Sequence, residues 1–219
     1  MKFEPSWPCE CGAQLVARVV GSERFSYAIC SNCERKVYVV EGVETGPIAA
    51  RLLGRVKEEI ERGDFTLGIL LSAMTIECEI SQMFFKWKSI EHCLKNHVDT
   101  REASEQGGKA WEQEYSGWRS IQKKMDSVSI YLTGVKFDDF AVGLGFVEQL
   151  DIKYPEFGGY AQIFKLRNRI VHNGEVDLGE SEALTSRDYA VAILRVAVAM
   201  NREKYRKVFS PSTPASRCS

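Results

Sequence analysis

Three polar residues close together in the C-terminal third of the chain could bind a phosphate and move a proton. They are Arg167, Asn168 and His172, within the segment KLRNRIVHNG at residues 165–174. On an α-helix at 100° per residue, Asn168 and His172 share one face because they are four positions apart. A guanidinium neutralises phosphate oxygens, and an imidazole exchanges a proton near neutral pH. The spacing therefore predicts a compact site for phosphate chemistry on one helix.

The helix that carries these residues also has an apolar arc, which we expect to be buried. The arc is formed by Ile163, Phe164, Leu166, Ile170 and Val171. Arg167 falls near its middle, and a buried guanidinium is costly unless a carboxylate pairs with it. Glu77 has apolar helical neighbours, so we expect Glu77, rather than Glu79, to pair with Arg167. Alternatively, the arc is a subunit interface and Arg167 points into a cleft between protomers.

Two more basic residues and a helix end complete this candidate site. Lys165 precedes His172 by seven positions and shares its face, whereas Arg169 lies to one side. An Asn-Gly pair follows His172 and is typical of a helix C-cap. His172 therefore lies in the last turn, where the helix dipole favours the imidazolium. A purely structural alternative stays open, in which His172 caps the helix and Arg167 only satisfies a carboxylate.

Four cysteines near the start of the chain have the spacing of a zinc site. Cys9-x-Cys11 is followed by Cys30-x-x-Cys33, and four thiolates give zinc a closed tetrahedral site. The pattern resembles the two knuckles of a zinc ribbon, although the first pair has one intervening residue where two are usual. We expect this zinc to be structural, because four protein ligands leave no position for water. A disulfide or unligated thiols are the alternatives, and the spacing does not reveal what the ribbon contacts.

Patterns along the chain predict a mainly α protein, a helical bundle preceded by a small β-rich zinc ribbon. The ribbon is expected at residues 1–42, with strands within 14–20, 24–29 and 36–40. A linker is expected at 43–47, the helical domain at 48–208 and a disordered tail at 209–219.

Within the helical domain, apolar periodicity and caps predict six helices. They are expected at 47 to about 62, 65–94, 111–132, 137–150, 160–172, and from a cap at Thr185 or Ser186 onward. The polar segment 98–108 is predicted to be a loop.

The charge balance excludes an overall basic field that would attract nucleic acid, since the 219 residues carry a formal net charge of −1. Basic residues gather only locally near the end of the last predicted helix, at Arg202, Lys204, Arg206 and Lys207. Such a run is either an RNA-binding patch or an ordinary set of cations at a negative helix end.

A cytoplasmic protein without a membrane span is expected. No N-terminal signal is recognised, and Glu77 and Glu79 interrupt the most apolar stretch. The cysteines outside the zinc pattern are scattered, which suits a reducing compartment.

The segment Arg167-Asn-x-x-x-His172 resembles the motif of the HEPN superfamily, in which an arginine and a polar residue precede a histidine by a few positions. The wider pattern is similar too: an apolar helix with a glutamate, then the motif near the end of a late helix, then one more helix. The resemblance covers roughly residues 47–208, although 98–135 departs from the compact form.

This resemblance implies a metal-independent endoribonuclease of a toxin–antitoxin, abortive-infection or other antiviral system. It implies a homodimer in which the motif residues of both protomers line one cleft, and it leaves room for an antitoxin or regulatory partner. His172 would be the general base or acid, Arg167 would stabilise the phosphorane, and Asn168 would orient the phosphate or His172. The RNA 2′-OH would attack, giving 2′,3′-cyclic phosphate and 5′-hydroxyl ends.

Two other functions remain open. The first is a non-catalytic HEPN-like module that binds RNA, a nucleotide or a protein partner, with the zinc ribbon used for recognition or docking. The second is a zinc-dependent transcriptional regulator, which is weaker because the chain has neither a recognisable helix-turn-helix nor a strong basic face.

Overall fold

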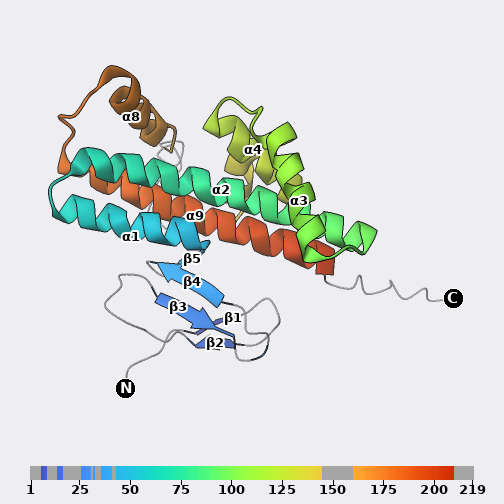
Figure 1. The fold of residues 1–219 in the computed structure, drawn as a ribbon. Coiled ribbons are helices and arrows are strands. Elements are labelled where there is room, and N and C mark those ends of the chain that lie inside the picture. The colour runs from blue at the N-terminus through green and yellow to red at the C-terminus, as the bar shows by residue number, and fades with distance from the viewer. Residues whose placement is uncertain are drawn as a thin grey trace.

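The computed structural model describes the chain at residues 6–8, 14–16, 26–30, 32, 36–40, 43–144 and 160–209. In this part the protein is mainly helical, as the sequence predicts. Three long helices lie side by side (Figure 1): α1 (Pro47–Glu61), α2 (Phe65–Asn96) and α9 (Glu180–Phe209). Short strands lie against α1 and α9, and shorter helices cover the opposite side of the bundle.

The first long helix forms where the sequence places apolar residues every fourth position. Pro47 occupies its first turn, where a missing N–H has no helical partner to lose. Val56 and Ile60 are buried against neighbouring helices. Gly63, with φ of +82°, ends the turn after the helix. The predicted helix from 47 to about 62 is therefore confirmed.

The second helix, α2, contributes to both apolar clusters of the described core. Near its start Ile69 packs with Leu53 of α1, and further along Phe84 and Trp87 pack with α4 and α9. The indole Nε1 of Trp87 donates a hydrogen bond to Asn201 Oδ1 at 2.7 Å, which satisfies the one polar group of a fully buried ring.

By length and composition alone, α2 is the one helix in the described part of the chain that could cross a membrane. Half of its most apolar window is buried inside the protein. A core helix of a soluble protein has the same length and composition, so these properties do not distinguish the two.

The polar segment 98–108, predicted as a loop, is mostly helical. It forms α3 (Thr100–Ala110), which begins at the N-cap Asp99. Ala103 and Gly107 are buried against α2, so tertiary packing compensates for the lack of an apolar stripe. The loop prediction is wrong because it was based on the polarity of the segment and overlooked the N-cap Asp99.

The helix predicted over 111–132 is divided in two. A π-helical turn, η1 (Trp111–Tyr115), continues α3, and α4 (Ile121–Thr133) begins separately after the N-cap Ser120. Gly134, with φ of +95°, ends α4 in the left-handed conformation that glycine adopts readily.

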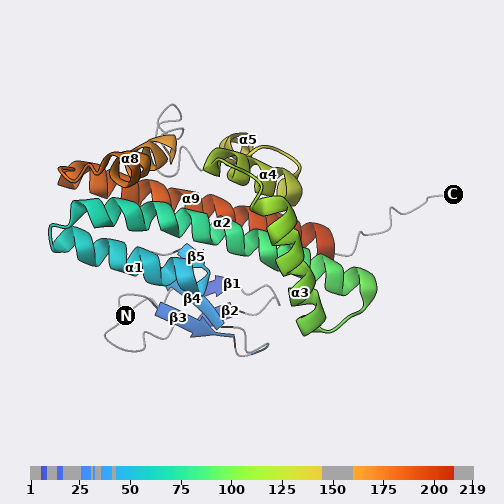
Figure 2. The same cartoon turned by 45° about the horizontal axis from the view of Figure 1, so that its top comes forward.

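Two shorter helices follow. The predicted helix 137–150 begins as α5 (Phe137–Gly143), and residues beyond 144 lie outside the described part. The predicted helix 160–172 is confirmed as α8 (Tyr160–Asn173). Figure 2 shows α8 lying over the first half of α2, whereas α3, α4 and α5 gather around its second half.

The last helix starts earlier than predicted. It begins at Glu180, and the backbone N–H of Gly179 donates to Glu182 Oε2 at 2.7 Å. The carboxylate thus caps the N-terminus and complements the helix dipole, so no cap at Thr185 or Ser186 is needed. The predicted apolar stripe on this helix is confirmed, since its members are buried or pack on the core: Tyr189, Ile193, Val196 and Met200.

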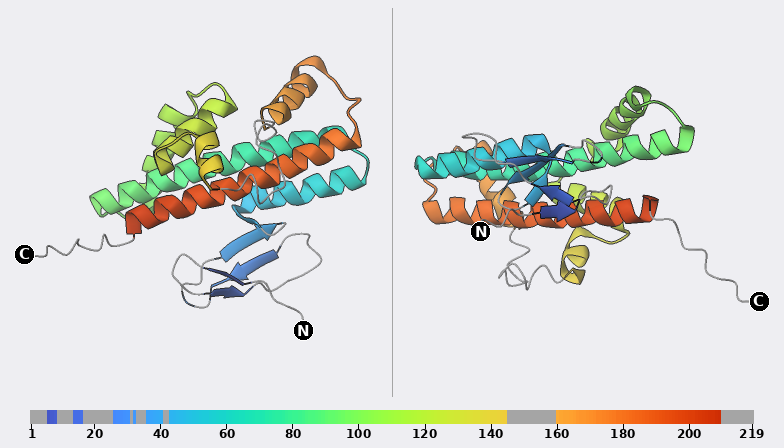
Figure 3. Two further views of the ribbon diagram at one scale, coloured as in Figure 1. Left: turned by 180° about the vertical axis from the view of Figure 1, so that it is seen from behind. Right: turned by 90° about the horizontal axis from the view of Figure 1, so that it is seen from below.

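Five short strands precede the helices: β1 (Ser6–Pro8), β2 (Gln14–Val16), β3 (Ser26–Ile29), β4 (Lys36–Val40) and β5 (Val43–Thr45). Antiparallel pairing joins β1 to β2, and β3, β4 and β5 in that order (Figure 3). The predicted strand segments contain β2, β3 and β4. The segment predicted as a linker, 43–47, contains β5 and the first residue of α1, while most of the predicted tail lies outside the described residues.

Candidate functional site

The candidate site lies on α8, whose apolar side packs on the bundle. Ile163 and Phe164 are buried, and Leu166 and Ile170 are partly buried against the core. Val171, predicted to belong to the buried arc, is 53% exposed. Burial therefore decreases along α8 towards its C-terminal end, where the candidate residues lie.

Arg167 does not pair with the carboxylate that we predicted. Its side chain is half-buried, and Nη1 donates to Asn168 Oδ1 at 2.9 Å. No ion pair joins it to Glu77 among the described residues; Glu77 lies by Tyr115, whose hydroxyl donates to the Glu77 carbonyl at 3.5 Å. The prediction assumed a buried guanidinium. Because Arg167 keeps partial access to water, a buried carboxylate is not required.

Glu79, which the prediction set aside, has the structural role instead. Its Oε2 accepts a hydrogen bond from Thr45 Oγ1 at 2.7 Å and another from the backbone N–H of Gly46 at 2.9 Å. Gly46 is the N-cap of α1 and has no side chain to cap the helix. Glu79 therefore ties the end of β5 and the start of α1 to α2, a contact between distant segments that no local sequence signal reveals.

The other motif residues lie on the exposed side of α8. Asn168, His172 and Lys165 are all exposed. His172 is in the last turn, and Gly174, with φ of +66°, ends the helix by donating its N–H to Ile170 O at 3.1 Å. The predicted cap at the end of this helix is confirmed.

Arg169 is engaged with a nearby carboxylate. Its Nε donates to Glu175 Oε2 at 2.6 Å, and its Nη2 contacts the other carboxylate oxygen. These hydrogen bonds and the charge of Glu175 raise the pKa of the Arg169 guanidinium above its ordinary value. Arg169 thus joins α8 to the segment that follows it, and is less available to a ligand than Lys165 or Arg167.

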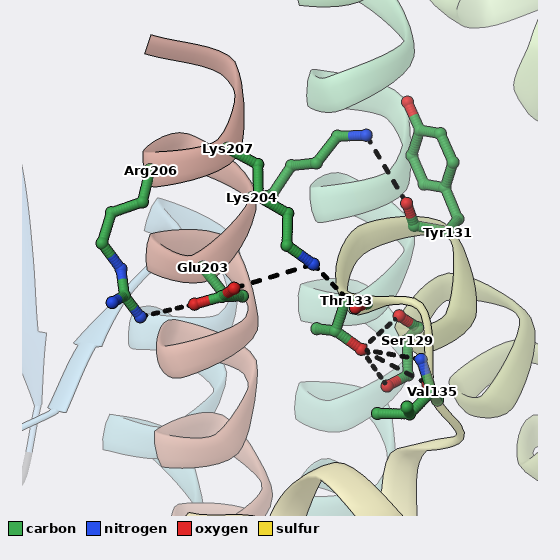
Figure 4. A network of polar contacts seen from close by, with 8 residues as sticks. All are labelled: Ser129, Tyr131, Thr133, Val135, Glu203, Lys204, Arg206 and Lys207. Carbon is green, nitrogen blue, oxygen red and sulfur yellow. Dashed lines mark hydrogen bonds and ion pairs between the residues drawn. The ribbon is translucent and has the colours of Figure 1, made fainter. Parts of the chain in front are cut away.

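Most of the basic residues near the end of α9 contact carboxylates or carbonyl groups of the protein itself (Figure 4). Lys204 Nζ lies 2.6 Å from Glu91 Oε1, and Lys207 Nζ donates to the Thr133 carbonyl at 2.8 Å. Arg206 pairs with Glu203 one turn earlier on α9. Lys204 Nζ also donates to the Tyr131 carbonyl at 3.5 Å, so both lysines stabilise the C-terminal end of α4, which agrees with the structural interpretation of this run.

The cysteine quartet lies mostly outside the described part of the chain. Cys30 follows β3 directly and is buried, whereas Cys9, Cys11 and Cys33 are not among the described residues. Within the described ranges, no three histidine, cysteine or carboxylate side chains gather in a way that could hold a metal. The zinc ribbon therefore stays a prediction from spacing.

Taken together, α8 presents a guanidinium, a carboxamide and an imidazole in one short stretch of exposed or half-buried surface. These groups can bind a phosphate and exchange a proton, and the hydrogen bond between Arg167 and Asn168 holds two of them next to each other. Comparisons with family models, curated proteins and solved structures gave no match for this chain.

Proposed function

We propose that this protein is a metal-independent endoribonuclease of a defence or toxin type, with Arg167, Asn168 and His172 as its active-site residues. The observation that carries the proposal is their joint placement in the C-terminal half of α8, where Asn168 and His172 are exposed and the half-buried Arg167 donates a hydrogen bond to Asn168. The resemblance of this segment to the HEPN motif supplies the reaction class.

The chemistry follows from what these groups can do to RNA. The 2′-OH attacks the adjacent phosphorus, and an imidazole accepts the hydroxyl proton. The new P–O2′ bond forms as the P–O5′ bond breaks, and a protonated imidazole donates a proton to the departing 5′ oxygen. Arg167 neutralises the charge that develops on the phosphorane oxygens, and Asn168 orients the phosphate or the imidazole. No oxidant, metal or other cofactor is needed for this balance.

Two imidazoles are needed, and the motif supplies one per chain, so we propose that a homodimer forms the complete site. Surface hydrophobicity next to the motif supports this arrangement. Val171 is 53% exposed and Val176 is 66% exposed, and both lie within four residues of His172. A second protomer that covers these side chains would place its own His172 near the same phosphate.

The proposed zinc ribbon has a structural and docking role in this account. Cys9, Cys11, Cys30 and Cys33 would hold the ion through four thiolates, which stabilise the small N-terminal module but add no reactive water. An antitoxin or regulatory partner, and a cytoplasmic location, belong to the same proposal.

The test is RNA cleavage by purified full-length protein in EDTA, which removes contaminating metal-dependent nucleases. We expect His172→Ala to lower the cleavage rate by about 10²- to 10⁴-fold, the usual contribution of a general acid–base. His97→Asn is the matched control, because His97 is exposed at a left-handed position that asparagine tolerates. Cleavage that survives His172→Ala would refute the proposed site.

A second candidate function, a binding module without catalysis, is favoured by one observation. Among the described residues, no side chain forms a hydrogen bond with the imidazole of His172 that would orient it for proton transfer. This function predicts that RNA, nucleotide or partner binding occurs without cleavage and is unchanged in His172→Ala. The cleavage assay above separates the two functions.

A further inference from the structure

A polar cleft lies between the second half of α2 and the α3–η1 segment, away from α8. It has a volume of about 330 Å³, at the lower end of the range for small-molecule sites. From α2 it is lined by Lys88, His92 and Lys95, and from the opposite wall by Gln106, Lys109 and Gln113. The spacings within each set place the side chains on one helix face.

The positive charges in this cleft exceed the negative ones. Two carboxylates line it, but each is already paired: Glu114 contacts Lys88 Nζ at 2.8 Å, and Glu91 contacts Lys204 Nζ at 2.6 Å. Within the described part of the chain, Lys95 and Lys109 form no ion pair. The cleft therefore carries two uncompensated ammonium groups, one on each wall.

The walls of the cleft are held in place by the packing of α3 on α2. A Cβ on Gly107 would lie 2.0 Å from Ser89 Oγ, so the two helices approach as closely as a glycine allows. Directly beyond, η1 adds a π-helical turn, closed by the bond from Ser116 N–H to Trp111 O at 3.0 Å. That turn contributes Gln113 to the cleft, and single π-turns recur at functional sites.

Lys88 is held in place by two aromatic rings as well as by the carboxylate of Glu114. Its Nζ lies 5.2 Å from the centre of the Phe84 ring and 4.9 Å from that of Tyr131. Such a cation loses little conformational entropy when a ligand binds. Lys88 is thus preorganised, whereas Lys95 and Lys109 are exposed.

We propose that this cleft binds a nucleoside phosphate, either as a free nucleotide or as part of an RNA strand. Lys88 and Lys95 are seven residues apart on α2, or about 10 Å along the axis, and Lys109 lies on the opposite wall, two residues beyond the Gly107 that packs against Ser89. The positive charges therefore come from positions spread along the cleft. A ligand that uses them is extended, with an anionic group joined to a larger polar body. The amides of Gln106 and Gln113 and the ring of His92 offer that body hydrogen bonds. This site goes beyond the proposed ribonuclease and does not depend on it.

The test compares the full-length protein with a Lys95→Gln/Lys109→Gln double variant, with inorganic phosphate, AMP and a short RNA as probes at low salt. The RNA arm uses His172→Ala protein throughout, so that cleavage does not consume the probe. A Lys57→Gln/Lys123→Gln double variant removes the same charge from exposed positions on α1 and α4. Urea unfolding of each variant checks that the fold is kept.

We expect AMP or RNA to bind the wild-type cleft and to bind the Lys95→Gln/Lys109→Gln protein about tenfold more weakly, as two charge-assisted contacts in an open cleft imply. The control double variant should stay within about twofold of the wild type. Binding of AMP identifies a free nucleotide as a ligand, and binding of RNA alone identifies a strand. Equal affinity of the two double variants, or no binding of any probe at millimolar concentration, would overturn the proposal.

Discussion

Replacing Glu79 by alanine is the most informative perturbation of the fold. The single oxygen Oε2 accepts hydrogen bonds from Thr45 Oγ1 and from the Gly46 N–H, at 2.7 and 2.9 Å. Thr45 is only 8% exposed, so water does not easily replace the lost acceptor. The substitution would therefore leave the Thr45 hydroxyl and the N–H of Gly46, the N-cap of α1, without this acceptor.

The expected loss in the free energy of unfolding follows from these two hydrogen bonds. A hydrogen bond to a charged group contributes about 1.5–3 kcal/mol, and an unsatisfied buried donor costs about 1–3 kcal/mol. Because Glu79 itself is only half-buried, we expect a combined loss of about 2–4 kcal/mol in the free energy of unfolding. For a domain of this size that corresponds to a fall in Tm of roughly 5–15 °C.

The assay is urea and thermal unfolding followed by helical circular dichroism, with two companion variants. Glu77→Ala is the matched control, because Glu77 lies two residues away on the same helix and is also half-buried. It should cost less than about 1 kcal/mol. Glu79→Gln keeps a carbonyl oxygen that can accept both bonds without the charge, so its loss should be intermediate.

The comparison of Glu79→Ala with Glu77→Ala tests the structural role assigned to Glu79. Equal destabilisation by Glu79→Ala and Glu77→Ala would refute the role assigned to Glu79. A loss confined to Glu77→Ala would refute it as well.

Three further predictions concern packing, pH and metal. Gly107→Ala should destabilise the protein by about 1–3 kcal/mol, because its Cβ would lie 2.0 Å from Ser89 Oγ; Gly108→Ala, which meets a neighbouring atom only at 4.0 Å, should be neutral or slightly stabilising in thermal unfolding. Hydrogen bonds and charge from neighbouring arginines lower the pKa of the Glu59 carboxyl. The Glu59 carboxylate therefore makes its full contribution to folding stability above its pKa in the unfolded state, about 4.3. That contribution is lost as the pH falls through the lower pKa of the folded state. Wild type and Glu59→Gln should therefore converge in stability in acid, and a constant difference from pH 7 to 3 would contradict this. Chelation of zinc should unfold residues 1–42 and leave the helical domain folded, as hydrogen exchange would report; simultaneous loss of both would show that they share one core.

Local sequence signals predicted the elements whose formation depends on periodicity and caps. The four-residue repeat and Pro47 located α1, and the Asn-Gly pair after His172 located the end of α8. Polarity misled the assignment of α3, although Asp99 was a recognisable cap for that helix. The break between η1 and α4 was also missed, although Ser120 is a recognisable cap whose hydroxyl accepts the Lys123 N–H at 3.1 Å.

Pairings between distant residues were harder to predict. Glu77 and Glu79 differ by two positions on α2, and the choice between them depends on where β5 and α8 pack, which helical neighbours do not determine. Arg167 was predicted to be buried and paired with Glu77 from its position in an apolar arc, but burial decreases along α8 and Arg167 is half-buried. The exposed face with Asn168 and His172 was predictable because it follows from helical spacing alone.

The central claim, a ribonuclease that uses His172 and the RNA 2′-OH, is tested most directly by end-group analysis of RNA incubated with the protein in EDTA. We predict 2′,3′-cyclic phosphate and 5′-hydroxyl ends from the wild type and from His97→Asn, and intact RNA from His172→Ala. Fragments with 3′-hydroxyl and 5′-phosphate ends, or cyclic phosphates from the His172→Ala protein, would contradict the claim.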